Sequence, residues 1–183
     1  MDARRYYACR VRFDGAPAFL IGYADDRDGF VRDPDARLVA APTADALAEA
    51  AAARGLALEP GAPDDHDLDA LRAWCADPDP ARVDPPRFLD AWNVFDDLAR
   101  LYERTGSPYT RLSRRAEGCY DKLFRALRSA GGGPAWRPDE LALLRRVFRA
   151  GLARLRAELS AAGVGGGPRR GRGVRRWTRR PNS

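Results

Sequence analysis

Few residues of this 183-residue chain have the type and spacing that chemistry requires. The chain contains one histidine, His66, so any site that pairs a nucleophile with an imidazole must use it. His66 lies among three aspartates in residues 64–67, a run that is typical of a loop and predicts a raised histidine pKa. We therefore expect no catalytic role for His66.

Carboxylates on the predicted central helix are the second group of residues that could take part in catalysis. Asp90, Asn93 and Asp97 recur at helical spacing and should share one helix face. The neighbours Asp96 and Asp97 point about 100° apart on a helix, so they do not form a pair that shares one site. A solvated polar face is the simplest interpretation, and a hydrolase-type enzyme that uses these carboxylates is an alternative.

Metal and cofactor motifs are missing from the sequence. Cys9, Cys75 and Cys119 are dispersed and odd in number, which indicates neither a disulfide framework nor a zinc site. The loop over residues 24–35 resembles a calcium loop only in part, because its first position is Ala24 and its twelfth is not glutamate. The sequence has no phosphate-binding glycine loop and no nucleophile elbow. We predict no metal and no cofactor, and the sequence favours a protein without enzyme activity over the hydrolase alternative.

The end of the chain carries the strongest compositional signal. Residues 165–183 contain glycine and arginine but no acidic residue, and we expect this tail to be disordered. Its candidate nucleic-acid-binding residues are Arg169, Arg170, Arg172, Arg175, Arg176, Trp177, Arg179 and Arg180. Arginine binds phosphate and tryptophan stacks on bases, so the tail favours binding of nucleic acid or another polyanion. A tail that only adds solubility is the alternative.

One helix should position the rest of the chain. The apolar residues of 88–102 recur in steps of four and three, which predicts a helix whose buried face carries Phe88, Trp92, Phe95, Ala99 and Tyr102. We expect this helix to be the surface on which the other elements pack.

The remaining pattern places strands first and helices second. Alternation and turn residues predict strands at 4–13, 18–23, 30–32 and 37–41, with a fifth at 55–58. Helices are expected from Thr43 to Gly55, at 68–76, at 119–128 and from Pro138 onward, with Phe124 and Leu127 facing inward in the third. Residues 59–67 are expected to form a connector, and Gly106 and Pro108 are expected to end the helix over residues 88–102. This order predicts an α+β fold, in which a C-terminal helical bundle packs on one face of an N-terminal antiparallel sheet of four or five strands. We expect residues 1–164 to form one domain.

Charge is distributed unevenly. Residues 1–103 hold 12 arginines and 21 acidic residues, a net charge of −9, whereas residues 104–164 have a net charge of +8 and the tail adds +7. Such a distribution steers a charged partner or lets two parts of one fold attract each other. The sequence has no apolar run long enough to span a membrane and no signal peptide, so a cytoplasmic protein is expected.

Three strings resemble a family of small, uncharacterised bacterial proteins with an N-terminal sheet and a C-terminal helical part: residues 88–93, 120–124 and 136–141. The resemblance covers most of residues 4–160 and implies the α+β fold. The hydrophilic residues of the three strings that it singles out are Asn93, Asp121 and Lys122. Lys122 is the only lysine of the chain, and an ion pair between Lys122 and Asp97 is one expectation. The family pattern implies a polar Gly/Asn segment after residue 124. Residues 125–133 of this chain do not follow that pattern.

These observations favour a non-enzymatic cytoplasmic protein that binds another macromolecule, with a protein as the expected partner. One concrete version is an immunity-like or antitoxin-like protein whose acidic N-terminal portion covers a basic partner. The candidate partner-binding residues are Asp25, Asp26, Asp28, Asp90, Asn93, Asp97, Asp121 and Lys122. Nucleic-acid binding through the tail is the alternative from a second class.

Overall fold

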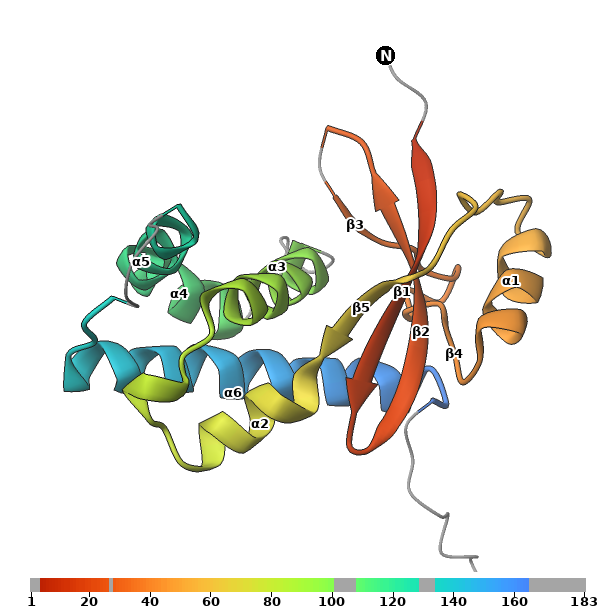
Figure 1. Cartoon of the computed structure of the whole chain (residues 1–183). Helices are drawn as coiled ribbons and strands as arrows, with labels where there is room; N and C mark the ends of the chain where they lie inside the picture. Colours follow the sequence, from red (N-terminus) through yellow and green to blue (C-terminus); the bar gives the residue numbers. More distant parts are fainter. Residues whose placement is uncertain (1–3, 27, 101–107, 129–133, 165–183) are drawn as a thin grey trace, which may run out of the picture.

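The structure is a computed structural model that describes residues 4–26, 28–100, 108–128 and 134–164. The strands are β1 (Arg5–Phe13), β2 (Ala16–Ala24), β3 (Gly29–Phe30), β4 (Ala40–Ala41) and β5 (Asp64–Asp67). The helices are α1 (Ala44–Ala52), α2 (Leu68–Ala76), the 3₁₀ turn η1 (Pro80–Arg82), α3 (Pro85–Arg100), α4 (Pro108–Arg115), α5 (Glu117–Leu127) and α6 (Pro138–Ala161). The predicted α+β class is confirmed: the sheet comes first and most helices follow (Figure 1).

The sheet is mostly antiparallel, with one parallel pair. Its strand order is β3-β2-β1-β5, and β4 also pairs with β2. β1 and β2 form a long antiparallel hairpin, whereas β5 runs parallel to β1, with Val11 opposite His66. The predicted fifth strand at 55–58 contributes one parallel bridge, between Tyr6 and Leu58, and the fifth strand of the sheet is β5 instead.

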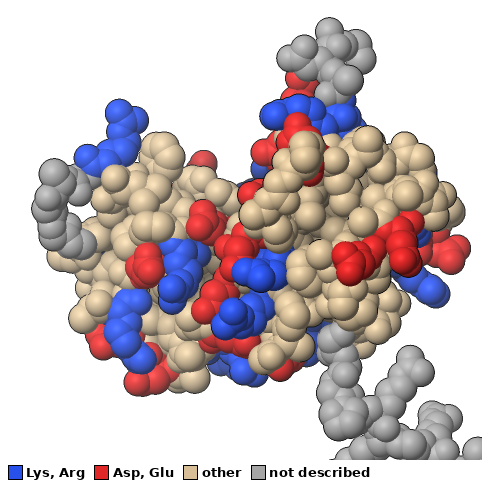
Figure 2. Space-filling view, turned by 45° about the vertical axis from the view of Figure 1, so that its right-hand side comes forward, with Lys and Arg blue, Asp and Glu red and all other residues tan. Residues whose placement is uncertain are grey.

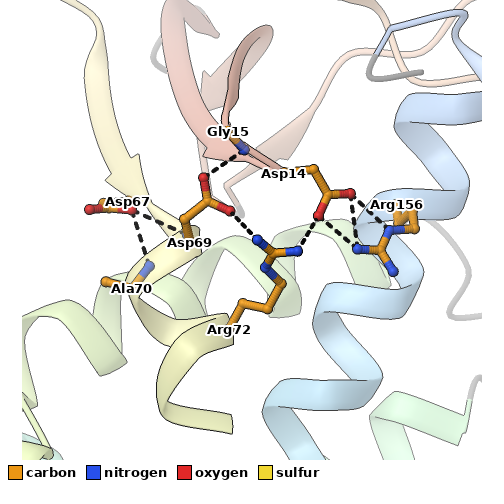
Figure 3. A network of polar contacts seen from close by, with 7 residues as sticks. All are labelled: Asp14, Gly15, Asp67, Asp69, Ala70, Arg72 and Arg156. Atoms are coloured by element: carbon orange, nitrogen blue, oxygen red, sulfur yellow. Dashed lines mark hydrogen bonds and ion pairs between the residues drawn. The ribbon is translucent and has the colours of Figure 1, made fainter. Parts of the chain in front are cut away.

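The turn of the β1–β2 hairpin joins the sheet to two helices. Asp14 and Gly15 both have positive φ, as a tight two-residue hairpin turn requires. Asp14 accepts hydrogen bonds from Arg72 of α2 at 2.7 Å and from Arg156 of α6 at 2.8 to 3.1 Å (Figure 3). The Gly15 N–H donates to Asp69 of α2 at 2.8 Å. These contacts fix the end of the hairpin against the helical layer.

The two faces of the sheet bury separate clusters. One face contributes Cys9, Val11 and Leu20 to the main core, which it shares with α2, α3 and α6. The opposite face contributes Ile21 to a smaller cluster with Leu47 of α1. The expectation that all helices cover one face is therefore wrong, because α1 lies on the other side of the sheet (Figure 1). Apolar side chains on both faces of β2 require this arrangement.

The prediction for the central helix is confirmed. Trp92 and Phe95 are each 1% exposed, and Phe88 and Ala99 are also buried, whereas Tyr102 lies outside the described residues. Trp92 meets Phe148 of α6 edge to face, with ring centroids 5.6 Å apart. α3 and α6 therefore share an aromatic interior.

Two local predictions are wrong, and one helix was not predicted. β5 occupies residues that were expected to form a connector, because pairing with β1 imposes the extended conformation. The helix without a prediction is α4, which Pro108 opens. Phe124 and Leu127 are each 48% exposed, because α5 buries Cys119 and Leu123 on a different side.

Among the described residues, no helix combines the length and the apolar character that crossing a bilayer requires.

Candidate functional site

A pocket of about 280 Å³ lies where β5 leads into α2 and faces the first turns of α3. The residues that line it are Asp65, His66, Asp67, Leu68, Asp84, Pro86, Arg87, Asp90 and Ala91. Four of these side chains are carboxylates, and Arg87 is the one arginine among them. The pocket therefore has the charge to attract a cation.

Two of the carboxylates are engaged by helix starts. Asp67 is the N-cap of α2 and accepts hydrogen bonds from the backbone N–H groups of Asp69 and Ala70, both at 3.2 Å. Asp84 accepts from the backbone N–H of Arg87 at 3.4 Å, and its second oxygen lies 3.8 Å from Arg87 Nε. The positive ends of the helix dipoles stabilise both charges.

Asp65 is paired within the sheet. Arg10 of β1, opposite Asp65 in the β1–β5 register, donates from Nε at 2.8 Å and also from Nη2. This pairing lowers the pKa of Asp65. Asp65 is therefore an ionised carboxylate whose charge Arg10 already balances.

Asp90 is the carboxylate of the pocket that stands apart. It lies on an exposed face of α3, and within the described part of the chain it makes no hydrogen bond or ion pair. Its negative charge acts to raise the pKa of His66, although burial has the larger and opposite effect on that pKa. Asp90 is thus available to a ligand.

His66 lies in a strand, and its pKa changes in the direction opposite to the one predicted. Burial lowers the pKa of His66 and outweighs the opposing negative charges of Asp90, Asp64 and Asp65. Its Nδ1 is buried and has no hydrogen-bond partner among the described residues. The imidazole is therefore neutral near pH 7.

A second acidic group lies at the other end of α3. Asp97 accepts a hydrogen bond from Arg100 Nη1 at 2.9 Å, and the same nitrogen donates to the backbone oxygen of Asp28 at 2.9 Å. The pKa of Asp97 is raised to about 6, chiefly by burial; Arg100 acts to lower it, and the charges of Asp28 and Asp96 act to raise it. Asp97 is therefore not part of a solvated face, whereas Asp90 and Asn93 are exposed.

Asp96 has a structural role. One of its oxygens accepts from the Tyr109 hydroxyl at 2.9 Å and from the Ser113 hydroxyl at 3.1 Å, and Ser113 in turn accepts from Trp92 Nε1 at 3.2 Å. Burial raises the pKa of Asp96 in spite of these bonds. A smaller pocket of about 210 Å³ lies beside this network, lined by Asp96, Ala99, Arg100, Thr110, Ser113 and Arg114.

The other predicted site residues do not come together in one place. Asp25 pairs with Arg4 at 2.5 Å, and Asp26 and Asp28 are exposed in the loop after β2. Asn93 accepts a hydrogen bond from the Tyr120 hydroxyl at 3.3 Å, which links α3 to α5.

Asp121 and Lys122 lie on α5 but have different surroundings. Asp121 is exposed, and its backbone oxygen accepts from Arg125. Lys122 pairs with Glu140 of α6 at 2.6 Å and lies over the Trp136 ring, 4.8 Å from its centroid. The expected ion pair between Lys122 and Asp97 is therefore wrong. Lys122 pairs with Glu140 instead and connects α5 to the start of α6.

The eight predicted tail residues, from Arg169 to Arg180, lie outside the described residues. Within the described part of the chain, no group of three or more His, Cys, Asp or Glu side chains is placed to hold a metal ion. Cys9, Cys75 and Cys119 are buried free thiols.

Sequence reasoning identified Asp90 but missed the rest of its pocket. The sequence predicts a connector over residues 59–67, which include Asp65, His66 and Asp67. The parallel pairing of β5 with β1, which brings this segment next to α3, has no local signal.

A comparison of the chain with protein-family models, with curated proteins and with solved structures finds no match. The resemblance to a bacterial family therefore stays a prediction.

Proposed function

We propose that this protein binds a basic segment of another protein, and that the pocket between β5 and α3 receives one of its arginine or lysine side chains. The single observation that carries the proposal is Asp90, a carboxylate that no described residue pairs with, in a pocket lined by three further carboxylates.

The contacts of the pocket support a cationic ligand. Arg10 balances Asp65, and helix starts hold Asp67 and Asp84, so these three side chains are fixed in place. Asp90 supplies a charge that has no ion-pair partner in the described part of the chain. A guanidinium or ammonium group bound there would gain a charge-assisted hydrogen bond and would leave the existing pairs intact.

An immunity-like or antitoxin-like protein that covers a basic partner is one concrete form of this function. A cytoplasmic location fits the three free thiols, since cytosolic proteins keep cysteines reduced. The acidic loop with Asp26 and Asp28 offers additional negative charge to such a partner.

The test measures binding of a labelled arginine-rich peptide to the full chain by fluorescence anisotropy at low salt. Asp90→Asn removes the charge while keeping the shape, and we expect an affinity loss of about tenfold, or ~1.4 kcal/mol. Asp35→Asn is the matched control, because Asp35 is exposed in a different loop and the substitution makes the same change in net charge. Equal affinity losses for the two variants would mean that only the net charge of the protein matters, which would contradict binding in the pocket.

The loop is tested in the same assay. Reversing the charges of Asp25, Asp26 and Asp28 should weaken binding if the partner extends onto this loop. Asp25 is paired with Arg4, so the Asp26 and Asp28 changes are the informative ones. Unchanged binding would restrict the partner to the pocket.

Nucleic-acid binding through residues 165–183 is the second candidate, supported by the seven arginines and one tryptophan of this segment. Full-length protein should bind single-stranded RNA with a steep salt dependence, and replacement of the tail arginines by glutamine should abolish binding. Equal binding by both proteins would exclude the tail.

An enzyme that uses Asp90 together with Asp97 has less support. Asp97 does not line the pocket of Asp90, and the two residues are about 10 Å apart along the helix axis. Two carboxylates that act on one substrate need to face the same site.

A further inference from the structure

β5 is the outermost described strand on one side of the sheet. The strand order is β3-β2-β1-β5, and among the described residues β1 is the strand that pairs with β5 (Figure 1). A strand uses one row of backbone N–H and C=O groups for each neighbour, so the second row of β5 faces away from β1. This free edge can pair with a further strand.

The free edge of β5 is accessible and short. Asp64 and Asp65 are exposed, and residues 59–62 before them are exposed as well. Pro63 comes directly before β5 and has no N–H group, so pairing with another strand begins at Asp64. After Asp67 the chain enters α2, which ends the edge. The edge therefore offers the backbone of the four residues of β5.

The acidic pocket lies along this edge. His66 is opposite Val11 of β1, which belongs to the main core, so His66 lies on the face of the sheet that the helices α2, α3 and α6 cover. Its neighbour Asp65 lies on the other face, where Arg10 pairs with it. The pocket is lined by both Asp65 and His66. A pocket that reaches both faces of an outermost strand lies beside the free edge of that strand.

The two faces differ in their charge balance. By the same alternation Asp64 lies on the face that α3 covers, and Asp90 belongs to α3. Within the described part of the chain, neither of these two carboxylates makes a hydrogen bond or an ion pair. On the opposite face Arg10 balances Asp65, and Arg12 adds a further positive charge. A cationic side chain is therefore attracted on the face of α3 and repelled on the other face.

We propose that the basic segment of the partner binds in an extended conformation and adds a strand to the free edge of β5. This inference rests on the proposed function and states how the partner is recognised at the same pocket. Backbone hydrogen bonds to β5 hold the segment, whatever its sequence. Because side chains alternate along a strand, every second residue of the segment faces α3, where arginine or lysine meets Asp90 and Asp64. The residues between them face Arg10 and Arg12 and should be neutral.

Alternating N-methylation of a peptide tests the backbone pairing. The probe is a labelled peptide of about eight residues in which arginine alternates with threonine, and its binding to the full chain is followed by fluorescence anisotropy at low salt. Two versions carry the same number of N-methyl groups, one on the arginines and the other on the threonines. Strand addition uses the N–H groups of one set only. Methylation of that set should lower the affinity by about tenfold or more, whereas methylation of the other set should change it by less than about threefold. Equal affinities of the two methylated peptides would overturn the proposal.

Hydrogen exchange of the full chain, followed by NMR, locates the added strand. The amides of β5 that face away from β1 should exchange about tenfold more slowly, or less, when the unmethylated peptide is at saturation. Amides of α5, whose residues do not line the pocket, are the control and should keep their exchange rates. Exchange over β5 that the peptide leaves unchanged would contradict strand addition.

Asp64→Asn separates a strand from a single side chain seated in the pocket. Asp64 lies on β5 but does not line the pocket, so only a ligand that continues along the edge reaches it. We expect the affinity of the unmethylated peptide to fall by about threefold or more, relative to the exposed control Asp35→Asn. Equal affinities of these two variants would show that the ligand does not extend along β5.

Two results distinguish strand addition from the proposed function. If Asp90→Asn weakens binding of the unmethylated peptide while the two methylated peptides bind equally, the pocket receives a basic side chain without an added strand. Strand addition is then excluded, and the proposed function stands. If Asp90→Asn and Asp35→Asn have the same effect on the unmethylated peptide, the pocket does not bind the basic segment, and both are excluded.

Discussion

Arg156 binds Asp14 across 142 positions of sequence, with three hydrogen bonds of 2.8 to 3.1 Å. Asp14 lies in the turn of the β1–β2 hairpin, and Arg156 lies near the end of α6. Arg72 of α2 reaches the same carboxylate (Figure 3). Among the described residues, this ion pair joins the acidic N-terminal portion directly to the basic C-terminal portion. Several acidic residues before α4 pair instead with arginines of the N-terminal portion itself, such as Asp65 with Arg10. Figure 2 shows the resulting mixture of acidic and basic side chains on one face of the molecule.

The first prediction concerns this junction. Asp14→Asn keeps a residue that tolerates the positive φ of the turn but removes the charge that two arginines share. We expect the free energy of unfolding to fall by about 1 kcal/mol in urea denaturation, and less at 1 M salt because the pairs are partly exposed. Asp35→Asn should have no measurable effect. An equal loss at low and high salt would show that the turn, rather than the charge, accounts for the stability.

The second prediction concerns the closest helix contact in the core. A Cβ added at Gly151 of α6 would lie 2.3 Å from the Phe95 ring of α3, so Gly151→Ala should destabilise the protein by about 1–3 kcal/mol. Gly118 of α5 is the matched control, because a Cβ there meets no atom within 4 Å. Gly118→Ala should stabilise by up to about 1 kcal/mol through helix propensity. Thermal unfolding of both variants checks the pair, and a neutral Gly151→Ala would contradict the close packing of α3 on α6.

The third prediction concerns stability as a function of pH. The folded-state pKa of Asp97 is raised to about 6, so its contribution to stability is complete below the unfolded value near 4 and is lost as the pH rises through 6. Asp97→Asn should therefore be more stable than the wild type at pH 7 by roughly 1–3 kcal/mol, and the difference should vanish at pH 4. Urea unfolding at the two pH values measures it. A variant that is less stable at pH 7 would mean that the Arg100 pair outweighs the burial of the charge.

The helices were the most predictable part of the fold. The spacing of Phe88, Trp92 and Phe95 identifies the buried face of α3, and the pattern of Leu68, Leu71 and Trp74 identifies α2. These signals are local, since a cap and an apolar stripe lie within a few turns of sequence.

The strands and the pocket depend on contacts that are remote in sequence. Four polar residues form β5 only because β1 offers its edge, and His66 is half buried because α3 packs beside it. The same reason explains the pKa of His66: its acidic neighbours in sequence predicted a raised value, but burial by distant segments lowers it. The prediction that Phe124 and Leu127 face inward is wrong because periodicity shows that a face is apolar without showing what covers it.

The pKa of His66 offers the fourth prediction and the most direct test of the acidic pocket. The negative charge of Asp90 raises the pKa of His66 against the effect of burial. A cation seated beside Asp90 would cancel that charge, so the His66 pKa should fall further when the arginine-rich peptide binds. Asp90→Asn should lower it in the absence of peptide and remove most of the response to peptide. NMR titration of the imidazole in the full chain, with and without peptide, measures both effects. A peptide that binds without changing the His66 pKa would place the basic partner elsewhere on the molecule and contradict the account.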